Sequence, residues 1–378
     1  MSLREKIVQE IRDRGPIPFS RYMELCLYDP ELGYYSRNTE QFGKAGDFYT
    51  SSDVHAVFGR LLARQFEEMW RVLGSPPEIE ILELGPGRGL FAQDVLDWSE
   101  KKFPEFFHAL HYSLLERSQS LQQRLQNALS RHVSVGRASL LAGKGRFHRL
   151  LANEAPIIVF ANEFFDALPV EVLSPRGGLR IAEKEGRFIE TWAAASAAEL
   201  EFLDRYCVHP ENGERVEASL AAQDAMSEIA ACIKRGFVVI IDYGYDRQEQ
   251  LAGRHRGTVT AYRQHSVSKN PYEAPGEQDI TAHVNFTALG AAAESQGMQV
   301  QPLLTQSQFL LGLGEENQFA DAFAECRLPQ ERAKVALQLK HLVTPSGMGE
   351  TFHVMVASKG VDRKIIHKLS GLNFGRHS

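Results

Sequence analysis

A glycine-rich turn after a short apolar strand constrains the fold of this chain more than any other feature. Residues 79–84, with the sequence IEILEL, predict a buried strand, and a helix is expected to begin near Leu90. Between them lie three glycines at alternate positions, Gly85, Gly87 and Gly89. Glycine has no Cβ, so such a turn can lie close against a ligand, and the N-terminus of the next helix supplies free N–H groups. The segment therefore predicts a strand–turn–helix unit that binds a ligand.

The spacing of these glycines indicates which ligand is bound. The dinucleotide fingerprint G-x-G-x-x-G requires a glycine at position 90, which is a leucine in this chain. The observed G-x-G-x-G, after an acidic and apolar strand, resembles instead the first motif of class I S-adenosylmethionine (SAM)-dependent methyltransferases. A nicotinamide-dependent oxidoreductase is therefore disfavoured, and a turn with a purely structural role remains the alternative.

A carboxylate stands at the end of the next expected strand. Residues 111–116 predict that strand, and Ser118 is expected to cap the helix that follows. The strand ends at Glu116, and a carboxylate at this position can accept hydrogen bonds from both hydroxyls of a ribose. The alternative is that Glu116 is a solvated residue at a strand end.

A third strand is followed by a group of polar side chains. Residues 157–161 are all apolar and predict a central strand that is buried on both faces. Asn162 and Glu163 follow directly, and Asp166 lies three residues further on. Open α/β sheets bind ligands at the carboxyl ends of their strands, and two carboxylates near two aromatic residues can hold a cationic substrate group. The alternative is helix capping by Asn162 or Asp166.

Four further blocks make the chain recognisable. They are YDPELGYY at 28–35, GDFYTS at 46–51, NEFFDALP at 162–169 and IDYG at 241–244. Together with the glycine turn, they resemble the MidA-like family of SAM-dependent methyltransferases, in family order and over most of the chain. Mitochondrial members of that family are arginine methyltransferases that assist the assembly of respiratory complex I.

The resemblance implies an α/β fold built on a Rossmann-like class I methyltransferase sheet. This sheet is mostly parallel with its last strand antiparallel, and it carries an N-terminal helical extension and substrate-side insertions. The expected divisions are the extension (1–74), the SAM-binding half of the core (75–173), an insertion with a hairpin and helices (174–235), the second half of the core (236–360) with a substrate loop (254–285), and a loosely ordered tail (361–378). Near the C-terminus, the apolar pattern predicts a strand over 299–304, a helix over 328–342 and a strand over 351–358.

The resemblance also implies that SAM is the cofactor. We expect it to be bound by the three glycines of the turn and by two polar residues at strand ends: Gly85, Gly87, Gly89, Glu116 and Asn162. The expected reaction is methyl transfer to arginine in a protein partner, for which the resemblance implies a subunit of a respiratory complex. The alternative is a SAM-binding assembly factor without catalysis. It is disfavoured because intact acids beside an intact glycine turn would then have no catalytic purpose.

The chemistry of arginine methylation selects the catalytic candidates. A guanidinium stays protonated in water, so the enzyme must desolvate it, orient it and remove a proton as its nitrogen attacks. Paired carboxylates suit this work, since one can hold the guanidinium through two hydrogen bonds while the other accepts the proton. Glu163 and Asp166 are the first candidates, followed by Asp47 and Asp242. His283 is a further candidate base, with a hydrogen-bonded structural role as its alternative.

Composition limits the class of protein and its partners. The 378 residues carry a net charge of −6, which argues against nucleic-acid binding. No run of about 18 apolar residues is present, so no membrane insertion is expected. Residues 1–6 lack an apolar signal region and contain an acid, which argues against a transit peptide, and the four cysteines form no C-x-x-C pair. We therefore expect a cytoplasmic protein without a metal site, and the oligomeric state stays open.

Overall fold

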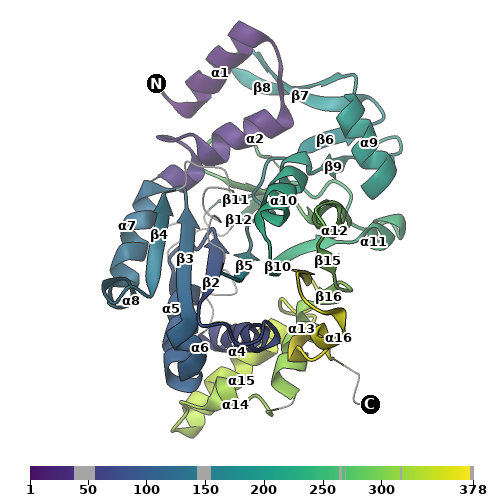
Figure 1. Cartoon of the computed structure of the whole chain (residues 1–378). Helices are drawn as coiled ribbons and strands as arrows, with labels where there is room; N and C mark the ends of the chain where they lie inside the picture. Colours follow the sequence, from purple (N-terminus) through teal and green to yellow (C-terminus); the bar gives the residue numbers. More distant parts are fainter. Residues whose placement is uncertain (38–55, 143–154, 264–265, 269, 316, 375–378) are drawn as a thin grey trace. The chain divides into compact units, whose positions relative to one another are not determined.

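The computed structural model describes residues 1–37, 56–142, 155–263, 266–268, 270–315 and 317–374. The chain forms two compact units, each assembled from three stretches of sequence (Figure 1). Unit 1 comprises Met1–Phe48, Phe164–Ser227 and Tyr243–Ala292. Unit 2 comprises Tyr49–Glu163, Glu228–Asp242 and Ala293–Ser378. The chain therefore passes from one unit to the other directly after Glu163 and directly after Asp242.

A mixed sheet forms the centre of unit 2, and its strands are in the order β15-β17-β10-β5-β2-β3-β4, with β16 also paired to β17. The successive pairs β4–β3, β3–β2, β2–β5 and β5–β10 are parallel, whereas β15 and β16 pair antiparallel with β17. Their bounds are β2 (Ile79–Leu84), β3 (Leu110–Glu116), β4 (Ala138–Ala142), β5 (Ile157–Asn162), β10 (Gly236–Tyr245), β15 (Gln299–Val300), β16 (Leu304–Thr305) and β17 (Phe352–Lys359).

The order of these strands creates a switch point between β2 and β5. From β2 the chain adds β3 and then β4 on one side, and it returns to place β5 and β10 on the other side. Ligands of open α/β sheets bind at such a point, outside the carboxyl ends of the strands. In unit 2 this is the edge where β2 leads into the glycine turn and β5 ends at Asn162.

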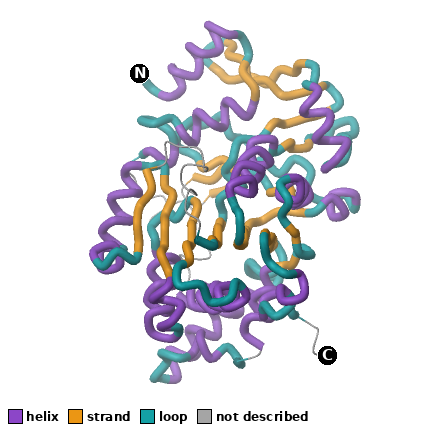
Figure 2. The backbone as a smooth tube through the Cα atoms, in the orientation of Figure 1, coloured by secondary structure: helices purple, strands orange, loops and turns teal. Residues whose placement is uncertain are grey.

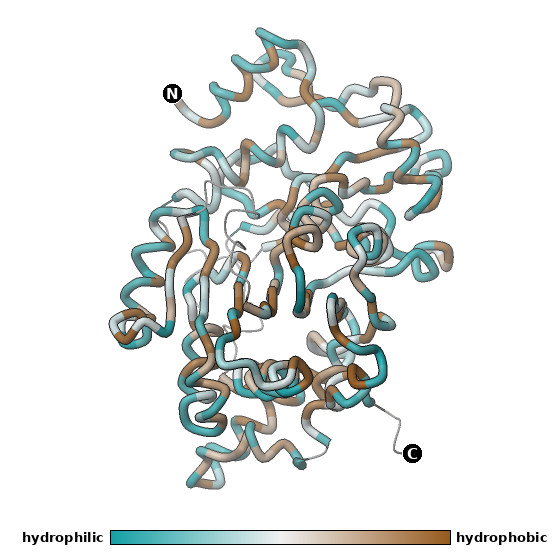
Figure 3. Tube along the Cα trace, viewed as in Figure 1, coloured by the Kyte–Doolittle hydropathy of each residue, from teal (hydrophilic) through white to brown (hydrophobic). Residues whose placement is uncertain are grey.

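Helices pack on the strongly apolar strands of unit 2, and Figure 3 shows hydrophobic residues along this sheet. The ring of Phe91 stacks on Phe160 with centroids 4.4 Å apart, and Phe66 meets Phe160 edge-on at 5.5 Å, so α4 and α5 both contact β5. The helices are α4 (Ala56–Val72), α5 (Leu90–Lys102), α6 (Pro104–Ala109), α7 (Gln119–Ala128), α8 (Ser130–Ser134), α13 (Gln306–Glu315), α14 (Ala320–Phe323), α15 (Pro329–Val343), α16 (Arg363–Ile366) and the 3-10 helix η3 (Ser370–Leu372). Helix α10 (Leu220–Cys232) passes from unit 1 into unit 2.

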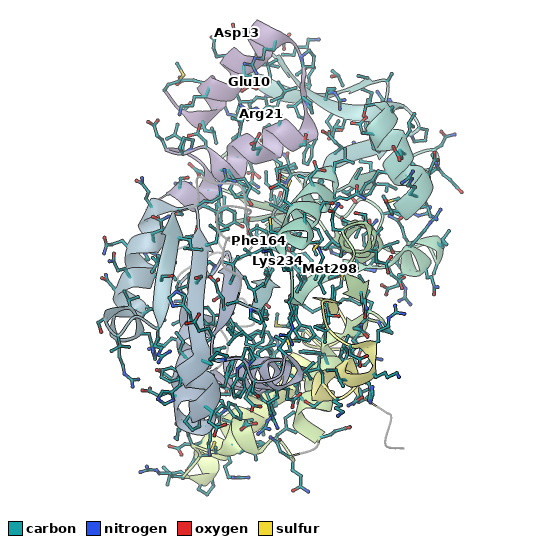
Figure 4. All side chains as sticks on the ribbon, in the orientation of Figure 1. Glu10, Asp13, Arg21, Phe164, Lys234 and Met298 are labelled. Atoms are coloured by element: carbon teal, nitrogen blue, oxygen red, sulfur yellow. The ribbon has the colours of Figure 1, made fainter. Side chains whose placement is uncertain are left out.

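Unit 1 contains two antiparallel sheets, of strand order β1-β7-β6-β9 with β8 beside β7, and β12-β11-β13 (Figure 2). Arg21 of α2 donates hydrogen bonds to Glu10 of α1, and Figure 4 labels this ion pair. The elements are α1 (Leu3–Arg14), β1 (Ile17–Pro18), α2 (Phe19–Tyr28), η1 (Tyr34–Ser36), β6 (Glu171–Ser174), β7 (Gly177–Lys184), β8 (Arg187–Ala193), α9 (Ala197–Tyr206), β9 (Val216–Ala218), α11 (Arg247–Leu251), β11 (Thr260–Arg263), β12 (Ser266–Ser268), β13 (Asp279–Thr281), β14 (Val284–Asn285) and α12 (Phe286–Ser295).

Three local expectations from the sequence need correction. The single strand predicted over 299–304 is two short strands, because Pro302 has no N–H and cannot donate to a ladder. The range 254–285, expected as a loop, contains three-stranded antiparallel pairing. The tail was expected to be loosely ordered, but α16 and η3 lie in it. The Ser370 N–H and hydroxyl donate to the Glu68 carboxylate at 2.8 Å, which fixes this segment to α4.

Among the described residues, no helix combines the length and the apolar character needed to cross a membrane.

Candidate active site

The glycine turn of unit 2 adopts a backbone that other residues reach only with strain. Gly85, Gly87 and Gly89 have φ of 63°, 54° and 78°, all in the left-handed region. The Gly85 N–H donates to the Leu115 carbonyl at 3.0 Å, so the turn begins beside the carboxyl end of β3. Gly89 is the N-cap of α5 and has no side chain with which to cap it. The N-terminal N–H groups of a 13-residue helix therefore lie at the end of the turn.

Glu116 lies next to this turn, at the end of β3. Its side chain is 8% exposed, and the Ser118 N–H donates to its Oε1 at 2.8 Å. Burial raises the pKa of the Glu116 carboxyl to about 7, against a smaller lowering by backbone hydrogen bonds. A buried carboxylate that is oriented by the backbone can accept two hydroxyl hydrogen bonds, as the sequence predicted for a ribose.

The carboxyl end of β5 lies on the other side of β2. Ala161 is paired with Leu84, so Asn162 lies beside the start of the glycine turn. The Asn162 Nδ2 donates to Glu163 Oε1 at 3.0 Å, whereas the buried Oδ1 of Asn162 has no hydrogen-bond partner in the part of the chain that the structure describes. A buried acceptor without a donor is uncommon in native proteins, and a ligand with an N–H or O–H group would satisfy it.

Glu163 is held in an unusual backbone conformation. Its φ is 49°, in the left-handed region that non-glycine residues rarely adopt, and its N–H donates to the Ile241 carbonyl of β10 at 3.0 Å. Such a conformation costs about 1–3 kcal/mol and is typical of functional sites. Asp242, a further candidate, is fully buried in β10.

These residues fit SAM. The turn, the N-terminus of α5, Glu116 and Asn162 lie at the carboxyl ends of three neighbouring strands, β3, β2 and β5. This set offers a glycine backbone for close approach, N–H donors for a carboxylate, a carboxylate for ribose hydroxyls and an amide oxygen for a donor group.

Unit 1 contains the candidate catalytic residue Asp166. Its side chain is 6% exposed, and the Tyr243 hydroxyl donates to its Oδ2. The Ala282 N–H donates to its carbonyl at 3.0 Å. Burial raises the pKa of the Asp166 carboxyl to about 6, and the hydrogen bond from Tyr243 acts in the opposite direction.

His283 also lies in unit 1, and it is hydrogen-bonded. Its Nδ1 is 2.8 Å from the Nδ1 of His255, and its N–H donates to the Thr258 hydroxyl at 3.1 Å. Its ring packs edge-on against Tyr243, with centroids 5.4 Å apart. Both the catalytic and the structural interpretation of His283 stay open as predictions.

Near Asp166 and His283, the structure places residues that the sequence did not single out as catalytic. Tyr35 donates its hydroxyl to Asp279 Oδ1 at 2.9 Å. Tyr243 belongs to the IDYG block, which was the sequence signal for it, but its contact with Asp166 joins residues 77 positions apart. Asp47, the remaining catalytic candidate, lies outside the described residues. In the described part of the chain, no three His, Cys, Asp or Glu residues are grouped so that they could hold a metal ion.

Comparison with known proteins shows the family to which the chain belongs. Residues 61–304 match the model of an S-adenosyl-L-methionine-dependent methyltransferase family. A Drosophila melanogaster protein named protein arginine methyltransferase NDUFAF7 homolog, mitochondrial, is 31% identical over 95% of this chain and 85% of its own length. The Mus musculus protein arginine methyltransferase NDUFAF7, mitochondrial, is 29% identical over 92% of this chain and 82% of its own length. A Burkholderia thailandensis structure bound to S-adenosyl-homocysteine has a TM-score of 0.79 at 27% identity, covering 95% of this chain and 92% of that one.

The fold and these relatives therefore define an enzyme of the SAM-dependent methyltransferase class, and SAM is its cofactor. Within that class, the chain belongs to the MidA-like family, as the sequence blocks predicted. The carboxyl ends of β3, β2 and β5 in unit 2, where Glu116, the glycine turn and Asn162 lie, are called the cofactor edge below.

One expectation is overturned by these relatives. The sequence predicted a cytoplasmic protein, but the relatives are named as mitochondrial proteins. The prediction rested on the lack of an apolar signal region in residues 1–6, on the acid among them, Glu5, and on cysteines that form no C-x-x-C pair. Most of residues 1–6 belong to α1, and Glu5 completes a capping box with Ser2, so helix formation accounts for the acid.

The ionisation of the Glu116 carboxyl predicts how cofactor binding depends on pH. The ionised carboxylate accepts both ribose hydrogen bonds, and protonation removes part of this capacity. Because the pKa of Glu116 is about 7, SAM affinity should be constant at alkaline pH and should fall as the pH drops below about 7. Truncation to alanine should weaken binding about tenfold to a hundredfold, because two hydroxyl donors lose their acceptor. Isothermal titration of S-adenosyl-homocysteine between pH 5.5 and 9 (about the range that brackets this pKa) measures both effects.

Glu116→Gln is the matched control for the pH dependence. Glutamine keeps the size of the side chain but does not titrate, so the part of the pH dependence that is due to Glu116 should disappear. An affinity for Glu116→Ala within twofold of the parent would show that the ribose is bound by another group.

Proposed function

We propose that this enzyme transfers the methyl group of SAM to an arginine side chain of a protein. The single observation that carries the proposal is the end of β5, where Glu163 is held at φ 49° beside the cofactor edge of unit 2. A carboxylate at such a position can bind a guanidinium through two parallel hydrogen bonds. The relatives are named protein arginine methyltransferases, which supports the same substrate.

Different residues of the chain have different roles in the proposed reaction. When bound, SAM would supply an electrophilic methyl group on a sulfonium: the arginine nitrogen would bond to the methyl carbon, and sulfur would keep the electron pair of the carbon–sulfur bond. Glu163 binds and orients the guanidinium, and Asp166 accepts the proton that the attacking nitrogen releases. A base with a pKa near 6 suits this role, because it is ionised at neutral pH and remains a useful acceptor. Asp47, Asp242 and His283 are kept as secondary candidates.

The finer features of the fold belong to the same proposal. We assign the sheet of unit 2 to the Rossmann-like class I methyltransferase arrangement, with β17 as the strand inserted antiparallel near its end. The cofactor contacts are assigned to the glycine turn, to Glu116 and to Asn162. Residues 174–235 and 254–285 are assigned to the recognition of the protein substrate. The acceptor is proposed to be a subunit of a respiratory complex, on the basis of the family resemblance.

The proposal is tested by comparing proteomes with and without the chain. Mass spectrometry should find a methylated arginine that disappears when the gene is deleted. Extract from the deleted strain, supplied with labelled SAM and purified enzyme, should regain the label at the same residue. Enzyme that binds SAM but restores no mark at any residue would favour the alternative, a SAM-binding assembly factor. A restored mark on lysine or on a small molecule would contradict the arginine assignment.

A further inference from the structure

Tyr243 occupies a fixed position at the end of β10. The strand pairs with β5 as far as Ile241, and its last residues, Gly244 and Tyr245, pair with β14. A Cβ at Gly244 would lie 2.2 Å from the Val284 carbonyl, so glycine is required for β14 to approach this closely. Tyr243 is therefore flanked by backbone that cannot shift freely, and its half-buried side chain is aimed by the strand.

The Tyr243 side chain contacts two of the candidate catalytic residues. Its hydroxyl donates to the Asp166 carboxylate, and its ring packs edge-on against His283. The backbone of Asp166 is tied to the same region, since its carbonyl accepts from Ala282, the residue before His283. Asp166 is thus held at its carbonyl by the segment that leads into β14 and at its carboxylate by β10.

Other ionisable groups surround the Asp166 carboxylate in unit 1. Burial raises the pKa of the Tyr35 hydroxyl well above its ordinary value. The charges of Asp279 and Asp166 add to this effect. Burial also raises the pKa of the Tyr262 hydroxyl, and the charges of the same two carboxylates add to it. Tyr35 donates its hydroxyl to Asp279. The Tyr243 hydroxyl donates to the Asp166 carboxylate.

We propose that Tyr243 is a positioning residue for methyl transfer: its hydroxyl fixes the orientation of the Asp166 carboxylate and keeps that carboxylate ionised. The inference rests on the proposed function, in which Asp166 accepts the proton that arginine releases. A hydrogen bond to an ionised carboxylate favours the charged form. Burial acts against that form, and the Tyr243 hydroxyl offsets part of this effect.

Tyr243→Phe removes the hydroxyl and keeps the ring against His283. The loss of one hydrogen bond to an ionised group should raise the pKa of Asp166 by about one unit. The acidic limb of the kcat/KM profile should move upward by the same amount. At a pH below the Asp166 pKa of both the parent and the variant, kcat/KM of the variant should be about tenfold lower than that of the parent. At alkaline pH the two should be equal. SAM affinity should stay within about twofold of the parent, because the hydrogen bond that is removed goes to Asp166, which is not among the residues assigned to the cofactor.

A direct readout does not require activity. Aspartate labelled with carbon-13 at the side-chain carboxyl gives a titration curve for Asp166, which the Asp166→Asn spectrum assigns. The parent should titrate near 6 and Tyr243→Phe about one unit higher. Tyr22→Phe is the matched control, because it deletes a buried hydroxyl of unit 1 that donates to the Pro271 carbonyl at 2.9 Å. This control should leave the titration and the pH profile unchanged.

The two proposals fail in different ways. An Asp166 titration that is the same in Tyr243→Phe and in the parent overturns the positioning role, whatever the activity. An unchanged pH profile in Tyr243→Phe, in an enzyme that Asp166→Asn inactivates, overturns it as well. Absence of arginine methylation by the parent overturns the proposed function instead, and the titration still decides whether Tyr243 controls this carboxylate.

Discussion

Replacing Gly87 with valine is expected to abolish SAM binding while the protein still folds. Gly87 is the central glycine of the turn and has φ of 54°, which a β-branched residue adopts only with strain of about 1–3 kcal/mol. The branched side chain would also project from the turn that we propose as the binding site of SAM, at the N-terminus of α5. We therefore expect no measurable heat of binding for SAM or S-adenosyl-homocysteine.

Gly136→Val separates the loss of the site from the loss of stability. Gly136 also lies in unit 2 with φ of 71°, and a Cβ there would meet no heavy atom within 4 Å. Both variants should lose stability through backbone strain, but Gly136→Val should keep normal SAM affinity. At a ligand concentration of about 100 Kd, bound ligand stabilises a protein by about 2.7 kcal/mol. Thermal denaturation should show this gain for the parent and for Gly136→Val only. Unchanged affinity in a folded Gly87→Val protein would contradict the assignment of the turn.

The parts of unit 2 that the sequence predicted are those whose signals are local. The strands β2 and β5 are short and largely apolar, and the glycine turn between β2 and α5 has the spacing G-x-G-x-G. Ser118 was predicted as a helix N-cap, and its side chain accepts from the Leu121 N–H. Each of these depends on neighbours within a few residues, so a single sequence contains the whole signal.

The elements that escaped prediction depend on distant partners. β4, of sequence ASLLA, was not predicted because five residues carry little periodicity, and it exists through its pairing with β3. β6 and β9 pair with each other across more than 40 residues. β11 and β13 are polar strands of four and three residues, which look like a loop until their antiparallel pairing is known.

The candidate site also has one part that local sequence predicts and another part that depends on distant residues. Gly85, Glu116 and Asn162 were predicted from their place after expected strands, and the register of the parallel sheet brings all three to one edge. The environment of Asp166 was not predictable, because it is created by Tyr243 and Ala282, which are 77 and 116 residues away in the chain. Its raised pKa follows from burial, which also depends on tertiary structure.

Glu163→Gln is expected to leave SAM binding near normal and to reduce methyl transfer about a hundredfold or more, the scale for a positioned acid–base group. Glutamine keeps the shape of the side chain but loses the negative charge that binds a guanidinium. The strain at φ 49° is shared by both residues, so the free energy of unfolding should change little. Glu163→Gly is the control for strain, since it should relieve the left-handed backbone and still be inactive. Full activity in a folded Glu163→Gln protein would remove Glu163 from the mechanism.

The roles proposed for Glu163 and Asp166 can also be tested by changing the side chain that accepts the methyl group. If Glu163 and Asp166 act as a pair on one guanidinium, Asp166→Asn should be similarly inactive, and the double variant should be little worse than either single variant. An acceptor peptide with lysine in place of arginine should fail, because an ammonium has no planar pair of donors for a carboxylate to bind. Radiolabel transfer to the two peptides measures this preference. Methylation of the lysine peptide at the arginine rate would exclude a site built around a guanidinium, because only a site that binds a point charge would treat the two peptides alike.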